Sequence, residues 1–184
     1  MPNIKPLRDV DEHVVINLFA FSGALPVSKG TLVRIETGYD AGADPLSLAA
    51  GTVGQSYQNT VSTRWVVPHK VSTAGTGDRP IGMLLYDVRE TDENGELLIF
   101  KPRKRWEMQT ALSGEAVPIL TKGLVLYTGV ANNQSPTGGA LAYIGAAGVL
   151  STAGAGTSIV SVGRFLGPTD SNGWVLVKLE LEAI

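Results

Sequence analysis

The stretch SVGRFLGPTDSNGWVLVKLEL, residues 161–181, contains one of the two clearest β-hairpin signals of this 184-residue chain. Two apolar runs flank a turn in which Asn172-Gly173 can take the positive φ that a tight β-turn requires. The second run alternates like a half-buried strand, with one apolar face and one wet face. The apolar face consists of Val175, Val177, Leu179 and Leu181. The stretch therefore predicts an antiparallel hairpin.

The rest of the chain repeats this pattern of short apolar runs between turns. It contains 22 glycines and 10 prolines, and the runs between them are rich in β-branched and aromatic residues. The clearest hairpin signal surrounds Asn94-Gly95, with strands predicted over 81–89 and 96–101. Further strands are expected at 13–21, 31–37 and 60–67.

Helical patterns are scarce. The segment 44–51 could form one or two helical turns, whereas 103–112 has no clear 3.6-residue period, so we favour a non-helical structure there. The segment 138–156 consists almost entirely of small residues, which predicts a partly ordered connection or a weak strand pair. We interpret the similarity of 25–38 to 117–129 as two β units with the same turn residues, and a true pseudo-repeat is the alternative.

These patterns predict an all-β fold of mostly antiparallel strands, sandwich or barrel-like, with at most one or two short helices. Residues 1–12 are expected to form an extended N-terminal arm, because Pro2 and Pro6 block a helix there. Residues 13–184 are expected to form a single β-rich domain, with the Gly/Ala-rich connection near 138–156.

Composition limits the classes of function. The formal net charge is −2, and only 17% of the residues are charged, against roughly 25% in ordinary globular proteins. So little charge indicates a surface that partners largely cover, and the near-balance argues against attraction to nucleic acid or membrane by bulk charge. The absence of cysteine excludes disulfides and thiolate chemistry. No targeting or membrane-spanning segment is expected either.

Residue types that serve catalysis or metal binding do not form a recognisable site. The two histidines, His13 and His69, lack metal-ligand spacing. The glycine-rich segment 75–82 lacks the GK[ST] ending of a phosphate-binding loop and predicts a connecting turn. The acidic residues near 92–96 offer too few oxygen ligands for a calcium loop. We therefore expect no enzyme activity, no cofactor and no metal.

The segment KPRKRW, residues 101–106, has four cations, a proline and a tryptophan in six residues. The acids of the preceding hairpin would neutralise these cations, and one tryptophan does not make the aromatic series of a single-strand nucleic-acid binder. We favour a corner at which Pro102 ends the hairpin, Trp106 packs inward and the arginines face another protein. Nucleic acid is not an expected partner.

Several segments resemble the tailed-phage head proteins known as capsid decoration, cement or head-stabilising proteins. Together they cover about half of the chain. They are the IGMLL strand with its acidic turn, then FKPRKRWEMQ and SGEAVPILTKG, and finally the terminal pair VGRFL and WVLVKL.

This resemblance implies a structural virion protein on the outer surface of the phage head, made in the host cytoplasm. Its partners would be the phage major capsid protein and further copies of itself, with a trimer favoured over a dimer. It would bind the assembled capsid lattice and stabilise the head without catalysis. The candidate contact residues lie in the arm and at the corner: Pro2, Ile4, Leu7, Arg8, Arg103, Lys104, Arg105 and Trp106.

The alternative is another non-enzymatic phage component, such as a head-fibre base or a carbohydrate-binding β module. A sugar site would use an exposed aromatic ring beside carboxylate or amide groups. Trp174, near Asp170 and Asn172, is the one such group in the sequence. We favour core or turn packing for these three residues.

Overall fold

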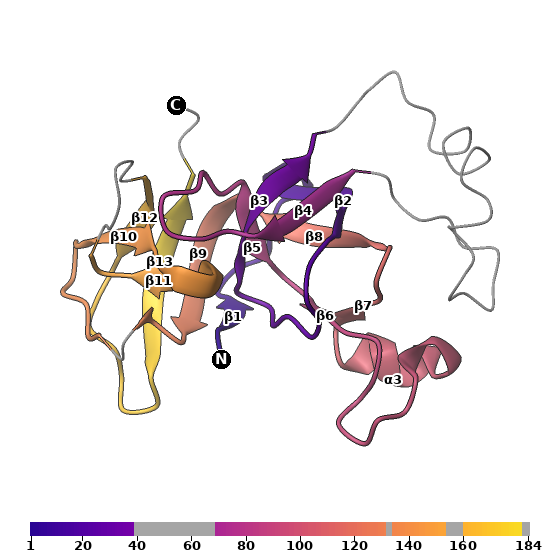
Figure 1. Ribbon diagram of the computed structural model, residues 1–184. Helices are drawn as coiled ribbons and strands as arrows, with labels where there is room; N and C mark the ends of the chain where they lie inside the picture. The colour runs from indigo at the N-terminus through magenta and orange to yellow at the C-terminus, as the bar shows by residue number, and fades with distance from the viewer. Residues whose placement is uncertain (39–68, 132–133, 154–159, 182–184) are drawn as a thin grey trace.

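The computed structural model describes residues 1–38, 69–131, 134–153 and 160–181. Figure 1 shows two β units side by side, a six-stranded sheet and a closed barrel, with the helix α3 (Pro102–Glu107) projecting beyond the barrel. Most strand pairs are antiparallel, and α3 is the single α-helix of the described residues. The prediction of an all-β fold with few short helices is confirmed.

The six-stranded sheet contains the end of the chain. Every neighbouring pair is antiparallel. Val175, Val177 and Leu179 are buried while Lys178 is exposed, so the predicted alternation of the last strand is confirmed. In order, the strands are β1 (Asn3–Pro6), β9 (Lys122–Thr128), β13 (Trp174–Glu180), β12 (Ser161–Phe165), β10 (Leu141–Ile144) and β11 (Leu150–Ser151).

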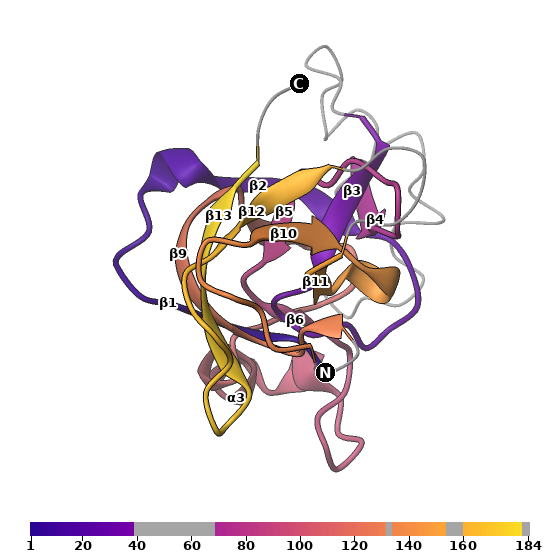
Figure 2. The ribbon, with the colours of Figure 1, turned by 90° about the vertical axis from the view of Figure 1, so that its left-hand side faces the viewer.

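The hairpin of β12 and β13 forms as the sequence predicts. The Asp170 carboxylate accepts hydrogen bonds from the backbone N–H groups of Asn172, at 2.9 Å, and Trp174, at 2.7 Å. Gly173 takes the positive φ, +82°, that this turn requires. Figure 2 shows the turn extending past the rest of the sheet. Local turn residues therefore fix this hairpin.

The barrel closes through five strands. β2 and β4 are parallel, and the other neighbours are antiparallel. The strands predicted at 13–21 and 31–37 are confirmed, except that the first begins with the 3-10 helix η1 (Glu12–Val14). Around the barrel, the order is β2 (Val15–Phe21), β4 (Lys70–Thr73), β3 (Leu32–Thr37), β5 (Gly82–Leu84) and β8 (Ala116–Leu120).

A β-bulge interrupts the pairing of β2 with β8. The register shifts by one residue between Ile16 and Phe19, so that Asn17 and Leu18 together lie opposite Pro118. Proline has no N–H group and cannot donate to the ladder, and an extra residue in the partner strand accommodates this gap. Asn17 and Leu18 are both exposed as a result.

The two β units share a hydrophobic core. Leu32, Met83 and Leu120 of the barrel belong to the same buried cluster as Tyr127 and Phe165 of the sheet. A second cluster fills the barrel interior. It includes Phe19, Phe21, Val33, Leu84, Val117 and Ile119.

The Gly/Ala-rich segment forms a short strand pair, one of the two predicted alternatives. In its described part, β10 and β11 pair antiparallel around the 3-10 helix η4 (Ala146–Gly148). A Cβ on Gly148 would lie 2.6 Å from Thr31 Cγ2 and 2.7 Å from the Leu32 carbonyl oxygen. Small residues therefore let this segment pack closely against the start of β3.

The hairpin predicted around Asn94-Gly95 is only partly correct. Its turn forms, with Gly95 at φ +80°, but a single antiparallel bridge between Thr91 and Leu97 replaces the two long strands. β5 pairs with the remote strands β3 and β8 instead. β6 (Asp87–Val88) pairs parallel with β7 (Thr110–Ala111), and the 3-10 helix η2 spans Leu98–Phe100. Long-range pairing therefore overrides the local hairpin signal.

The N-terminal segment is extended, as predicted, but it pairs with strand β9 of its own chain. Ile4 lies opposite Tyr127 and is only 2% exposed. A Cβ on Gly129 would lie 2.9 Å from Pro2 Cα, so this glycine permits the close crossing of the N-terminus. Pro6 is tolerated because β1 is an edge strand.

Three predictions fall wholly or partly on other parts of the chain. The helical turns at 44–51, the strand at 60–67 and the end of the Gly/Ala-rich segment at 154–156 lie outside the described residues.

Candidate interaction surface

Residues 89–109, which we call the α3 lobe, project from the barrel (Figure 1). The lobe contains the acidic turn, η2 and α3. Three large apolar side chains on it are exposed: Leu97, Phe100 and Trp106, the last at 77%. Exposed apolar side chains close together in a chain of low charge are typical of a protein-protein contact.

The helix α3 begins at Pro102, which takes the first helical position, where a missing N–H costs nothing. Arg103 Nε lies 3.1 Å from Glu107 Oε1, an i,i+4 pair that supports a short helix. The expectation that 103–112 is non-helical is therefore wrong for 103–107, because a proline at the first helical position and side-chain pairing stabilise a helix too short to show a period.

Asp92 anchors the acidic turn to the helix. Its Oδ1 accepts hydrogen bonds from the backbone N–H groups of Asn94 and Glu96, both at 2.8 Å, and its Oδ2 accepts one from Lys104 Nζ. The hydrogen bond from Lys104 is the main reason that the pKa of Asp92 falls to about 2. All three of these hydrogen bonds come from groups within the lobe.

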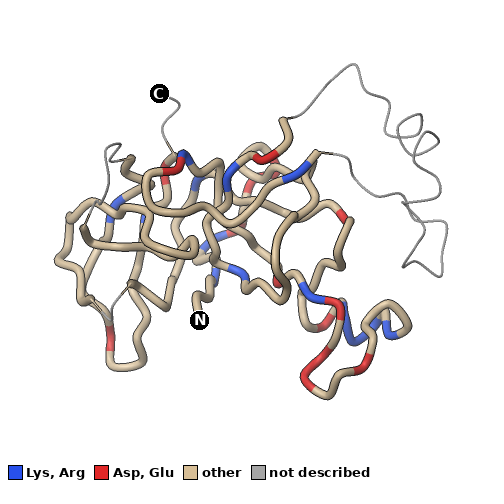
Figure 3. The backbone as a smooth tube through the Cα atoms, in the orientation of Figure 1, with Lys and Arg blue, Asp and Glu red and all other residues tan. Residues whose placement is uncertain are grey.

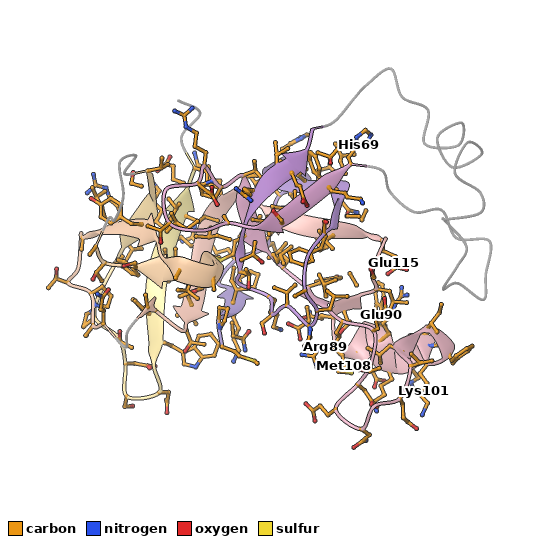
Figure 4. The ribbon with its side chains drawn as sticks, in the orientation of Figure 1. His69, Arg89, Glu90, Lys101, Met108 and Glu115 are labelled. Atoms are coloured by element: carbon orange, nitrogen blue, oxygen red, sulfur yellow. The ribbon has the colours of Figure 1, made fainter. Side chains whose placement is uncertain are left out.

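Arg105 ties the helix to the barrel. Its Nη1 lies 3.0 Å from Glu115 Oε1, and Glu115 Oε2 accepts a hydrogen bond from the Leu112 N–H at 2.9 Å. Figure 4 shows Glu115 between β8 and the α3 lobe. Lys101 pairs with Glu96 at the other end of the helix. Ion pairs thus hold the helix α3 on both sides, one within the lobe and one to Glu115 outside it.

The predicted neutralisation of the basic run is confirmed, although the partners differ in part. Figure 3 shows the acidic loop next to the basic helix. Lys101 and Lys104 pair with the preceding turn, as expected, whereas Arg103 pairs with Glu107 and Arg105 pairs with Glu115. The segment therefore presents little uncompensated charge.

The structure separates the four candidate residues of this helix into two pairs. Lys104 and Arg105 make internal ion pairs that build the lobe. Arg103, whose side chain is 93% exposed, and Trp106 face outward. The expectation that Trp106 packs inward is wrong, because Leu98 and not Trp106 supplies the buried apolar side chain of the lobe.

The candidate residues of the N-terminal arm also differ in their exposure to solvent. Ile4 is buried in the core and Pro2 is half-buried, whereas Leu7 and Arg8 are exposed beyond the end of β1. Figure 1 shows β1 near the middle of the molecule and α3 at one end. The arm and the α3 lobe are therefore two separate surfaces.

The structure has a cavity beside Trp106 that the sequence analysis does not predict. Its volume is about 290 Å³, and Asn17, Tyr86, Gln109 and Pro118 contribute to its walls. The signal that could have found it is Pro118, a proline within the apolar run AVPIL at 116–120, since a proline in a strand indicates a bulge and hence re-aimed side chains.

The group considered for sugar binding is engaged in its own turn. Lys5 Nζ lies 4.6 Å from the centre of the Trp174 ring, a cation–π contact, and the Asp170 carboxylate closes the turn. This agrees with turn packing. Among the described residues, no three acidic or histidine side chains gather as a metal site, and His69 Nδ1 lies 3.1 Å from the Gly38 carbonyl oxygen.

A comparison with protein-family models gives a match over most of the chain. The family model described as structural cement protein (E217 gp24/Pam3 gp6) matches residues 18–180 of the chain. No curated protein matches the sequence significantly. No helix of the described residues has the length and apolar character needed to cross a membrane.

Proposed function

Because this chain belongs to the family of phage structural cement proteins, we propose that it binds the outside of the assembled major-capsid lattice and stabilises the head. It is a structural protein of the phage virion, associated with the capsid. The observation that carries the proposal is the family match, which covers every β-strand of the described residues except β1 and the start of β2. The proposed site of action is the outer surface of the head.

Stabilisation by such a protein follows from mass action. A protein that binds the assembled shell better than its separate subunits shifts the equilibrium toward the shell by the difference in binding free energy. Many copies on a symmetric lattice add their contributions, so each contact can be weak. No catalytic step is needed for this role.

The proposed contacts involve the two exposed surfaces described above. On the α3 lobe, Trp106 and Arg103 offer an aromatic ring and a guanidinium group, which are enriched at the energetic centres of protein interfaces. On the N-terminal segment, Leu7 and Arg8 are exposed. Lys104 and Arg105 act indirectly, since their ion pairs hold α3 in place.

We further propose that the protein acts as a homo-oligomer, with a trimer favoured over a dimer. A symmetric oligomer multiplies its contacts with a symmetric lattice. Sedimentation velocity of the free protein, and of protein released from heads, measures this directly. A monomer in both samples would exclude the oligomer and leave lattice binding intact.

Addition of the purified protein to heads that lack it tests the proposed function. We expect saturable co-sedimentation with heads, regular density on the outer surface in a reconstruction, and a higher temperature of head disruption. Unassembled capsid subunits serve as the control and should bind less protein. Density at the tail, or no bound protein, would exclude a cement role.

A further inference from the structure

The cavity beside α3 takes its walls from distant parts of the chain. Asn17 comes from the bulge of β2, and Tyr86 follows β5. Trp106 lies on α3, and Pro118 belongs to β8. The volume, about 290 Å³, is close to the lower end of the roughly 300–1,000 Å³ that is typical of small-molecule sites. The cavity therefore suits a small ligand or one terminal unit of a larger one.

The charged groups in the cavity walls cancel each other. Arg105 Nη1 lies 3.0 Å from Glu115 Oε1, so the walls contain one cation and one anion that are already paired. A ligand of either sign would meet a like charge as well as an opposite one, and it would lose its hydration shell without a free counter-ion. The walls therefore favour an uncharged ligand.

Some polar groups in the walls have no partner. Among the described residues, neither the Asn17 amide nor the Tyr86 hydroxyl makes a hydrogen bond. The Gln109 amide accepts a hydrogen bond from Lys29 Nζ at 3.2 Å through its oxygen, which leaves its NH₂ group to donate. Amide and phenol groups both donate and accept, and an apolar ligand over them would leave them unpaired, which is unfavourable. The ligand should therefore carry groups that donate and accept hydrogen bonds.

Trp106 adds a flat apolar surface at the rim, since it is 77% exposed. The face of an aromatic ring carries partial negative charge and attracts the C–H groups of a ligand. A sugar ring combines such a C–H face with hydroxyl groups that both donate and accept. The Trp174 group lacks this combination, because Lys5 Nζ lies 4.6 Å from its ring and the Asp170 carboxylate closes the turn.

A nucleotide is the competing ligand, because a base can also stack on an indole ring and bind amide groups. Its phosphate would need free cations near the rim. Lys29 has no carboxylate partner among the described residues, but its ammonium group already donates to Gln109. The other nearby cations are in ion pairs: Lys101 with Glu96, Arg103 with Glu107, Lys104 with Asp92 and Arg105 with Glu115. The site therefore favours a sugar over a nucleotide.

We propose that this cavity is a binding site for a neutral carbohydrate. Trp106 stacks against one sugar ring, and Asn17 and Tyr86 form hydrogen bonds with its hydroxyl groups. This inference goes beyond the proposed function and does not rest on it, because the site is complete within one chain. It also gives the proline bulge a role, since the bulge places Asn17 in the wall.

The chain offers matched controls for this site. Phe100 is an exposed aromatic residue of the α3 lobe that does not line the cavity, so Phe100→Ala is the control for Trp106→Ala. Tyr143 of β10 is half-buried like Tyr86 and also lies outside the cavity, so Tyr143→Phe is the control for Tyr86→Phe. Each pair removes the same atoms on and off the site. Thermal unfolding of every variant checks the fold.

The experiment uses the full chain without heads. An array of neutral and acidic glycans, presented as single terminal sugars and as polysaccharide chains, shows whether a chain end or a chain interior binds. Methyl glycosides of glucose, galactose, mannose and N-acetylglucosamine, and the nucleosides adenosine and cytidine, are then titrated by NMR. We expect neutral sugars to bind and to shift the indole N–H signal that is lost in Trp106→Ala.

The variants should differ from their controls. We expect Trp106→Ala to weaken sugar binding roughly tenfold or more, and Tyr86→Phe to weaken it roughly two- to tenfold, through the loss of one hydrogen bond. Phe100→Ala and Tyr143→Phe should bind like the unchanged protein.

Three results would overturn the proposal. The first is that no neutral sugar on the array or in the titrations binds. The second is that acidic glycans or nucleosides bind in preference to neutral sugars. The third is that the cavity variants bind sugar as their controls do, which would place the sugar elsewhere. Because heads are absent from this experiment, its failure leaves the proposed cement role standing, and a failure to bind heads leaves the sugar site standing.

Discussion

Lys104 of α3 donates a hydrogen bond to the carboxylate of Asp92, whose side chain is only 1% exposed. The same carboxylate closes the acidic turn through two backbone N–H groups. This ion pair, together with the pair of Arg105 and Glu115, fixes the position of the helix that carries Trp106.

This pair makes the stability of the protein sensitive to acid. The pKa of Asp92 is lowered from 3.8 to about 2, mainly by the hydrogen bond from Lys104. A carboxylate with a depressed folded-state pKa contributes stability that is present above its unfolded pKa and is lost as pH falls through the folded value. We therefore expect stability to fall between about pH 4 and 2. Unfolding at stepped pH measures this fall. Asp92→Asn should flatten it, and the control Glu93→Gln should not.

Substitution of Lys104 should loosen the lobe, whereas substitution of Arg103 should not. Lys104→Met leaves the buried Asp92 carboxylate without its cation, which is unfavourable. Arg103→Met removes an exposed i,i+4 pair, worth roughly 0.3–0.5 kcal/mol. Hydrogen exchange over 92–107 should accelerate in the first variant and stay nearly unchanged in the second. Equal exchange in both would show that the Asp92 pair does not hold the lobe.

The close packing of η4 against β3 predicts a large difference between two glycine substitutions. Gly148→Ala combines a positive φ, +72°, with a contact of 2.6 Å to Thr31 Cγ2, and should lower the free energy of unfolding by about 3 kcal/mol. Gly139→Ala has φ +87° but no atom within 4 Å, and should cost about 1 kcal/mol. Urea denaturation compares the two. Similar losses would mean that backbone strain alone matters at Gly148.

The N-terminal segment should show separate effects on stability and binding. Ile4→Ala removes a buried side chain and should lower the free energy of unfolding by about 3 kcal/mol. Leu7→Ser changes an exposed side chain and should leave stability nearly unchanged while it weakens co-sedimentation with heads. Unchanged binding of Leu7→Ser would exclude this segment as a contact. Deletion of 1–12 is a poorer test, because it would also remove β1 from the sheet.

Sequence patterns predicted the structure where the determinants are local. The hairpin of β12 and β13 follows from an alternating strand and an Asn-Gly turn, which contacts within about 20 residues specify. The extended N-terminus follows from its prolines. The neutral basic run follows from nearby acids, although Glu115, the partner of Arg105, lies ten residues further along the chain.

The errors arose where distant segments compete. The apolar run at 81–85 pairs with β3 and β8, and that choice depends on the closure of the barrel and not on the adjacent turn. The direction of Trp106 depends on which side chain of the lobe is buried. Leu98 takes the buried position, and the Trp106 ring is exposed. A prediction of the cavity would need the pairing that places Pro118 opposite β2. Local patterns in a single sequence do not specify which distant strands pair.

The outer side of β1 has a consequence for how two copies of this protein could pair. The N–H of Leu7 donates to the Leu124 carbonyl oxygen at 3.0 Å, so the backbone N–H and C=O groups of residues 2, 4 and 6 point away from β9. Pro2 and Pro6 have no N–H group, which leaves Ile4 as the one donor on that side. Ile4 is only 2% exposed, so a strand from another copy would find carbonyl acceptors there but hardly any donor. Addition of a strand to this edge of the sheet is therefore disfavoured.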